Sequence, residues 1–162
     1  MNKQISTLLS SVILAQLLLV FVQPLAGAAN KPLVVVVGTA TPLRNISLGE
    51  LRHVFLGEPV EAGTGKPLVG INHPMGIATR ERFDLAVLGL KPDTIGRFWV
   101  DRRIRDQSPA PKAVQSAELA IRVVASLPGA ITYGTSDLVN KQVRALTIDG
   151  KAAGQPGYPL DD

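Results

Sequence analysis

The sequence predicts an α/β domain with a mostly parallel sheet flanked by helices. The first observation is residues 33–37, an unbroken run of leucine and valine that is typical of a strand buried on both faces. The second is residues 116–127, where one helical stripe is apolar and consists of Ala120, Val123, Val124 and Leu127. The third is the alternation of such strands and helices along the chain, which indicates helices packed on a sheet.

Residues 1–28 have the pattern of a secretory signal peptide. Lys3 precedes an apolar run at residues 12–22, and small residues at 26–28 suit a signal peptidase. The alternative is a membrane anchor, but the run is shorter than the ~20 residues that a spanning helix needs. We therefore expect cleavage after Ala28, a mature domain of residues 29–162, a periplasmic location and no membrane span after cleavage.

Charge and composition narrow the classes of partner. The chain has 17 basic and 13 acidic residues, a net charge of +4, and cleavage would leave 16 against 13, or +3. Aromatic residues make up only 4% of the chain, so small anions or acidic surfaces are favoured over nucleic acid. There is no cysteine, which excludes a disulfide framework and a lipid-modified cysteine anchor.

Capping and breaking residues predict the other elements. A capping box at residues 47–50 starts a short helix that Gly57 ends. The tail after Gly150 is rich in Gly and Pro and is expected to cross the surface as a strap. The same signals place strands at 67–72, 130–133 and 143–148, and helices from Thr79 and from Pro92.

No residue pattern predicts catalysis, a nucleotide site or a metal site. Residues 63–66 resemble part of a P-loop but lack its first glycine and the hydroxyl residue after the lysine. His53 and His73 are the only histidines, and no ligand spacing connects them. No glycine-flanked serine marks a nucleophile. We therefore expect a protein that is not an enzyme and that holds no cofactor and no metal.

The stretch PMGIATRERF, residues 74–83, predicts a helix start at which an anion could bind. Free amides and the helix dipole attract anions there, and Thr79 would donate its hydroxyl while Arg80 pairs with the anion. The alternative is that Thr79 only caps the helix, and both can hold together. His73 lies just before this helix start, at the end of a predicted strand.

The loop after the first strand is a second candidate for the same site. It contains Thr39 and Thr41, and ligands of α/β folds bind beyond the carboxyl ends of the strands. Both threonines also suit an ordinary turn. A cluster of arginines follows later in the chain, interleaved with acids, and predicts either a solvated helix face or a surface for an acidic partner: Arg97, Arg102, Arg103 and Arg105.

Three segments resemble one protein family. They are residues 45–57 (NISLGELRHVFLG), the stretch at 74–83, and residues 128–133 (PGAITY). Together they resemble the phosphate-specific periplasmic substrate-binding proteins of ABC transporters, which have the type 2 periplasmic-binding fold. The resemblance covers roughly residues 35–148 and is closest to the short members that consist of one lobe.

The resemblance implies a single lobe of this fold, in a family whose phosphate lies between two lobes. Alignment on Phe83 places Thr79 on the family's threonine, Ala78 on its glycine, Ile77 on its serine and His73 on its arginine. Only the threonine is retained. The expected ligand-binding residues are therefore Thr79, Arg80, Ala78 and His73, with Thr39 and Thr41 nearby.

Two hypotheses about function follow. The first is an exported module, similar to phosphate-binding proteins, that serves as a ligand-binding or accessory component in phosphate uptake or sensing. Its partner would be inorganic phosphate or a similar anion, and a second copy of the chain or an envelope protein would supply the second wall. The alternative is a protein-interaction module that has kept the fold and lost anion binding. It would dock on an envelope sensor or transporter through residues 97–105 or the C-terminal strap.

Overall fold

The computed structural model describes residues 31–162, with the exceptions of 64, 107–109 and 162. The predicted signal peptide, residues 1–28, lies outside the described residues. None of the helices described is long and apolar enough to cross a membrane.

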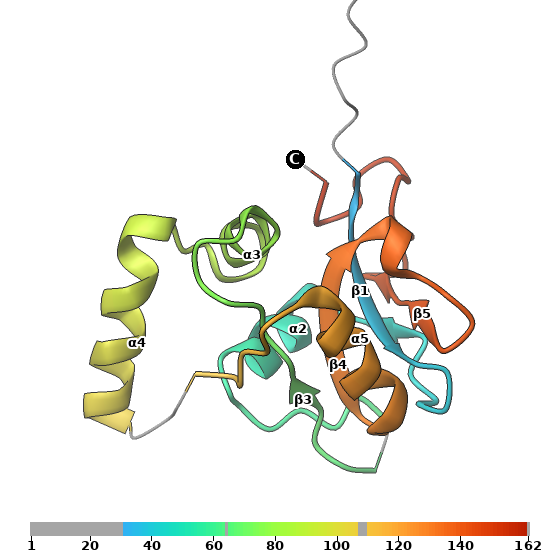
Figure 1. Ribbon diagram of the computed structural model, residues 1–162, viewed down its shortest axis with the longest axis horizontal. Helices are drawn as coiled ribbons and strands as arrows, with labels where there is room; N and C mark the ends of the chain where they lie inside the picture. The colour runs from blue at the N-terminus through green and yellow to red at the C-terminus, as the bar shows by residue number, and fades with distance from the viewer. Residues whose placement is uncertain (1–30, 64, 107–109, 162) are drawn as a thin grey trace, which may run out of the picture. The chain divides into compact units, whose positions relative to one another are not determined.

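A four-stranded sheet with the strand order β3-β4-β1-β5 forms the centre of the fold (Figure 1). The central strand β1 runs antiparallel to both β4 and β5, whereas β3 runs parallel to β4. A separate parallel pair consists of β2 and β6. The strands are β1 (Leu33–Gly38), β2 (Asn45–Ile46), β3 (Val69–Gly70), β4 (Ala130–Thr135), β5 (Val143–Ala145) and β6 (Thr147–Ile148).

The expectation of a mostly parallel sheet is therefore wrong at its centre. All six residues of β1 are buried, as the valine run predicts, but this burial requires only that both faces of the sheet be covered. Helices cover both faces of this mixed sheet, so β1 keeps its apolar pattern while running antiparallel to its neighbours. The pattern of one strand reports its burial and not the direction of the strands beside it.

Helix α2 begins where the predicted capping box places it. At the start of α2 the Ser47 side chain accepts a hydrogen bond from the Glu50 amide, and the Glu50 carboxylate accepts one from the Ser47 amide, which completes the capping box. The helices are α2 (Leu48–Phe55), α3 (Ala78–Phe83), the π-helix η1 (Asp84–Leu88), α4 (Pro92–Asp106), α5 (Ala117–Ser126) and the 3-10 helix η2 (Ser136–Leu138).

Alternate residues of β1 face two different groups of helices. Leu33, Val35 and Val37 belong to the main core, together with buried residues of α2, α3 and η1. Val34 and Val36 face the other way and pack with Ile121 of α5. This alternation follows from the two-residue repeat of a strand, and it explains why every residue of β1 is apolar up to Gly38.

The C-terminal segment is part of the main core. Tyr158 is 2% exposed and Leu160 is fully buried, and both pack in the cluster that contains β1 and α2. The expectation of a surface strap is therefore wrong. Glycine and proline set the backbone path of this segment, but its two large apolar side chains determine where it packs.

Gly38, at the end of β1, lies against the backbone of α5, and its replacement should destabilise the fold. A Cβ atom at Gly38 would lie 2.4 Å from the Val124 carbonyl oxygen and 3.3 Å from the Ala125 Cα. Because both contacts are backbone, we expect Gly38→Ala to lower the free energy of unfolding by about 1–3 kcal/mol in urea titrations. Gly49→Ala is the matched control, since the nearest atom to its new Cβ would be 4.0 Å away. Equal effects of the two changes would contradict this account.

Candidate functional site

A pocket forms where β3 and β4 end. The two strands are parallel, so their carboxyl ends meet at one edge of the sheet. His73 follows β3, Gly134 and Thr135 complete β4, and the first residues of α3 and α5 lie beside them. The cavity has a volume of about 100 Å³, and we call it the His73 pocket; it is lined by His73, Ile77, Thr79, Ala117, Gly134, Thr135 and Leu138.

The His73 pocket contains three of the positions that the family alignment equates with phosphate-binding residues. His73, Ile77 and Thr79 all line it, and Ala78 is the first residue of α3. The alternative that Thr79 caps the helix is wrong, because α3 begins at Ala78 with Ile77 as its N-cap and without a side-chain capping bond. Thr79 lies within the first turn, so its hydroxyl is not needed to start the helix.

The start of α3 supplies unpaired backbone donors. The first intrahelical bond runs from the Glu81 amide to the Ile77 carbonyl, at 3.0 Å. The amides of Ala78, Thr79 and Arg80 precede that bond, and no group in the described part of the chain accepts from them. Such amides are the usual feature by which a helix start attracts an anion.

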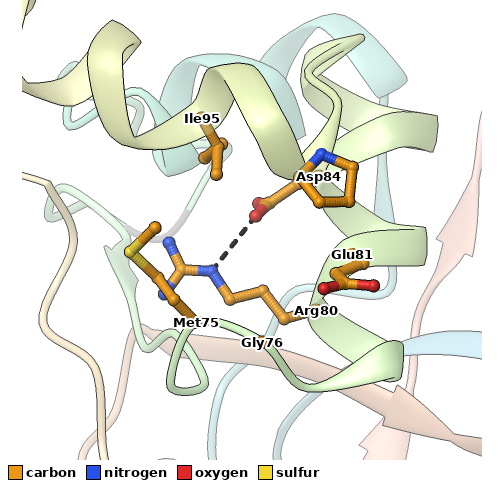
Figure 2. Close-up of a pocket in the computed structure, with 7 residues that line it drawn as sticks. Met75, Gly76, Arg80, Glu81, Asp84 and Ile95 are labelled. Carbon is orange, nitrogen blue, oxygen red and sulfur yellow. Dashed lines mark hydrogen bonds and ion pairs between the residues drawn. The ribbon is translucent and has the colours of Figure 1, made fainter.

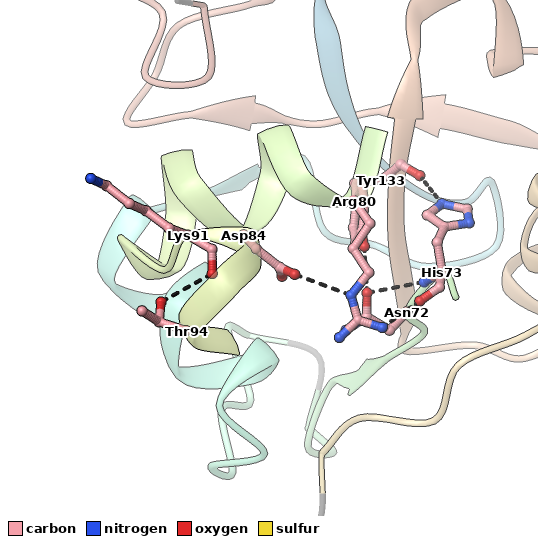
Figure 3. A network of polar contacts seen from close by, with 7 residues as sticks. All are labelled: Asn72, His73, Arg80, Asp84, Lys91, Thr94 and Tyr133. Atoms are coloured by element: carbon pink, nitrogen blue, oxygen red, sulfur yellow. Dashed lines mark hydrogen bonds and ion pairs between the residues drawn. The ribbon is translucent and has the colours of Figure 1, made fainter. Parts of the chain in front are cut away.

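His73 is held in place by its neighbours and is only 3% exposed. Its Nε2 donates to the Tyr133 carbonyl at 2.8 Å, and its backbone amide donates to Asn72 Oδ1 at 3.0 Å (Figure 3). With Nε2 protonated, Nδ1 of the neutral ring accepts hydrogen bonds and becomes a donor only in the imidazolium. The ring therefore favours an anion only when it is charged.

Two carboxylates lie close to the His73 pocket. The pKa of Asp137 is lowered to about 2, first by a hydrogen bond from Thr135 and then by Lys31. The pKa of Glu118 is lowered, first by a bond to its own backbone amide and then by Ser116, with smaller contributions from Arg122 and His73. Both carboxylates are solvent-exposed, so water screens them, but each opposes an anion in the pocket.

Arg80 points away from the His73 pocket. Its Nε donates to Asp84 Oδ2 at 3.1 Å, and another guanidinium nitrogen donates to the His73 carbonyl at 2.5 Å (Figure 3). The side chain is 6% exposed and lines a second cavity, which shares no lining residue with the His73 pocket (Figure 2). The structure therefore does not place the Arg80 guanidinium beside Thr79, and only its backbone amide remains near the predicted anion site.

Thr39 and Thr41 lie at the opposite end of the sheet. In the antiparallel register Leu33 faces Thr135, so the start of β1 lies near the His73 pocket and the loop after β1 lies far from it. The Thr41 amide donates to the Gly38 carbonyl at 2.9 Å, and the Thr41 hydroxyl accepts from the Gly129 amide at 3.2 Å. These threonines form a turn, as the second interpretation of the loop predicts.

The sequence analysis did not identify Asp84 as a candidate site residue, but the structure shows that its carboxylate is buried. It is 4% exposed, and burial raises its pKa despite the opposing effect of Arg80. The i,i+4 spacing of Arg80 and Asp84 was a signal for their pairing, but nothing in the sequence indicates that this helix face is buried. Within the described residues, no three His, Asp or Glu side chains gather where they could hold a metal ion.

Comparison with known proteins supports the fold. No family model and no curated protein sequence matches the chain. Among solved structures, an ABC-type phosphate transport receptor from Vibrio cholerae matches 80% of this chain with 16% identity and a TM-score of 0.63. A protein described as a phosphate ABC transporter substrate-binding protein, with bound phosphate, from Clostridium perfringens matches 76% with 18% identity and a TM-score of 0.60. PstS from Borrelia burgdorferi matches 75% with 13% identity and a TM-score of 0.56.

The match covers 53%, 47% and 49% of these three chains, so this chain spans about half their length. That extent agrees with the single lobe that the sequence resemblance implies. The predicted α/β class, with helices on both faces of a sheet, is confirmed. The chain therefore has the fold of about half of a phosphate-binding protein of the periplasmic-binding type.

Proposed function

We propose that this protein is an exported, non-enzymatic module that binds inorganic phosphate or a similar anion and serves phosphate uptake or sensing. The observation that carries the proposal is the position of the His73 pocket, at the carboxyl ends of β3 and β4 and at the start of α3. The amides of Ala78, Thr79 and Arg80 and the Thr79 hydroxyl would donate to the anion. Among the solved structures that match this chain, one is described as a phosphate transport receptor and another as a phosphate ABC transporter substrate-binding protein with bound phosphate.

The affinity for an anion depends on whether a second protein surface covers the open side of the His73 pocket. A helix start contributes about 0.3–1 kcal/mol to anion binding, and up to ~2 kcal/mol when it is sheltered, whereas micromolar affinity needs roughly 8 kcal/mol. The His73 pocket is small and open to water on one side, and the exposed carboxylates of Glu118 and Asp137 lie close to it. We therefore expect millimolar affinity in a single chain and tighter binding only when a second copy or an envelope protein covers the pocket.

Titration of phosphate into the purified protein at low salt tests this function. Backbone NMR shifts should saturate at Thr79 and its neighbours, more strongly with phosphate than with sulfate. Thr79→Val removes the hydroxyl and keeps the side-chain volume, so it should weaken binding several-fold. Thr94→Val is the matched control, because Thr94 is exposed and bonds only the Lys91 carbonyl. Shifts that are absent at tens of millimolar phosphate, or equal in both variants, would refute the anion site.

The alternative function, a protein-interaction module, is favoured by one surface. Helix α4 exposes Val100 (57%) and Ile104 (74%) beside the exposed arginines Arg97 and Arg103. The C-terminal segment does not offer a second such surface, since Tyr158 and Leu160 are buried. Charge reversal of Arg97 and Arg103 should release an acidic envelope partner in cross-linking experiments. If every partner stayed bound to that variant, docking through α4 would be ruled out.

A further inference from the structure

A second cavity lies between residues 75–76, α3 and the first turns of α4 (Figure 2). Its volume is about 120 Å³, slightly larger than that of the His73 pocket. We call it the Asp84 cavity. Its polar lining consists of Arg80, Glu81 and Asp84, and its apolar lining includes Met75, Pro92 and Ile95.

The main feature of the Asp84 cavity is a carboxylate oxygen without a partner. Asp84 is 4% exposed, and its Oδ2 accepts from Arg80. Its Oδ1 is buried and has no hydrogen-bond partner among the described residues. The carboxylate points into the space between Arg80, Met75 and Ile95 (Figure 2). Buried carboxylate oxygens in native proteins nearly always accept a hydrogen bond. We therefore expect Oδ1 to accept one from a donor that enters the cavity.

The charges around the cavity favour a cation. Arg80 contributes one positive charge, and Asp84 and Glu81 contribute one negative charge each, which leaves a net charge of −1 among the lining side chains. The guanidinium is already held by two oxygen acceptors, Asp84 Oδ2 and the His73 carbonyl. An anion in the cavity would be repelled by two carboxylates. A cation at Asp84 Oδ1 would instead give each carboxylate oxygen a positive partner, with Arg80 at Oδ2 and the bound cation at Oδ1.

The remaining walls fit a short hydrocarbon chain. Pro92 and Ile95 from α4 and Met75 from the preceding loop surround the carboxylate with apolar atoms. Met75 is 57% exposed, so its flexible side chain lies at the boundary with solvent. We propose that the Asp84 cavity binds a small primary alkylammonium ion, with an N–H donating to Asp84 Oδ1 and the alkyl group against Ile95 and Met75. This site is separate from the anion site and does not depend on it.

An NMR titration of the ¹⁵N-labelled protein with ethylammonium chloride tests the proposal. Saturable shifts are expected at the amides of Gly76, Arg80 and Asp84, beyond those caused by sodium chloride at the same ionic strength. Tetramethylammonium is the matched probe, because it has the same charge but no N–H to donate. It should cause no saturable shift in this region. Equal responses to the two ions, or a linear response to ethylammonium, would overturn the proposal and leave a water molecule as the partner of Oδ1.

Two variants separate the carboxylate from the shape of the cavity. Asp84→Asn keeps the size of the side chain and removes its charge, so ethylammonium affinity should fall at least tenfold. Ile95→Phe fills the cavity and leaves Asp84 unchanged, so it should abolish binding even if Asp84→Asn proves too unstable to examine. Ethylammonium shifts that persist in Ile95→Phe would show that the ion binds elsewhere. Phosphate titration reports on the His73 pocket, so each site can fail independently of the other.

Discussion

Replacing Phe83 with alanine is expected to lower the free energy of unfolding by about 3–5 kcal/mol. Phe83 is fully buried, and its ring stacks on Tyr133 with a centroid distance of 3.6 Å and meets the edge of Phe55 at 4.6 Å. Alanine would leave a cavity among side chains that come from β4, α2 and α3. These rings join the helix that contains Thr79 to the sheet, so their loss should also loosen the His73 pocket.

Urea or guanidinium unfolding curves measure this effect. Phe98→Ala is the matched control, because Phe98 lies on α4, is only partly buried and has one aromatic neighbour, Trp99, at 5.1 Å. We expect the control to lose clearly less stability. A loss at Phe83 of under 1 kcal/mol would mean that the three rings are not the structural link between α3 and the sheet.

Removing Arg80 should have a similarly large effect, because it leaves a buried carboxylate unpaired. The side chains of Arg80 and Asp84 are 6% and 5% exposed and form an ion pair at 3.1 Å. Breaking a buried pair by removing one partner typically costs about 3–5 kcal/mol. Arg80→Ala also removes the donor to the His73 carbonyl. We therefore expect a loss of this size in denaturant unfolding at neutral pH.

The loss in Arg80→Ala should depend on pH. Burial already raises the pKa of Asp84 above its ordinary value of 3.8, and removal of the Arg80 charge should raise it further. Below the ordinary value the carboxyl is neutral in both the folded and unfolded states, so the variant avoids the cost of an unpaired charge. As the pH rises through the raised pKa, that cost appears in the folded state. The stability difference from wild type should therefore be smallest near pH 3 and largest at neutral pH.

Two controls distinguish an unpaired charge from lost packing. Arg80→Met with Asp84→Leu replaces both charges by apolar groups and should recover much of the stability, without the pH dependence. Lys31→Ala breaks the exposed pair with Asp137, where the side chains are 59% and 52% exposed, and should change the free energy of unfolding far less than Arg80→Ala does. If Arg80→Ala behaved like Lys31→Ala at all pH values, the buried pair would have no structural importance.

Local patterns predicted the elements well. The capping box at Ser47 and Glu50 lies within one turn of α2, and the apolar patterns of β1 and α5 each lie within one element. Such patterns can be recognised in the sequence without knowledge of the other elements. The resemblance of three segments also predicted the fold. Three of the positions that it equates with the family's phosphate-binding residues, His73, Ile77 and Thr79, line one pocket.

Contacts between distant segments were not predicted. Only strand pairing decides that β1 runs antiparallel to β4, and this places the Thr39 loop at the opposite end of the sheet from His73. Only packing decides that Tyr158 and Leu160 enter the core. Nothing in the sequence indicates that Arg80 and Asp84 are buried, yet α4 and the loop at Met75 cover them.

The sequence by itself therefore determined the α/β class, the positions of β1, β4, α2 and α5 and the helix start beside His73, because the apolar patterns and backbone preferences that specify these features lie within single segments. The tertiary structure alone decided which predicted residues share a site. Thr79 and His73 line one pocket, the Arg80 guanidinium pairs with Asp84 in another, and Thr39 and Thr41 form a distant turn. The physical reason is that strand direction and helix burial depend on the free energy of the whole packed chain, and no single segment contains enough of the contacts to determine it.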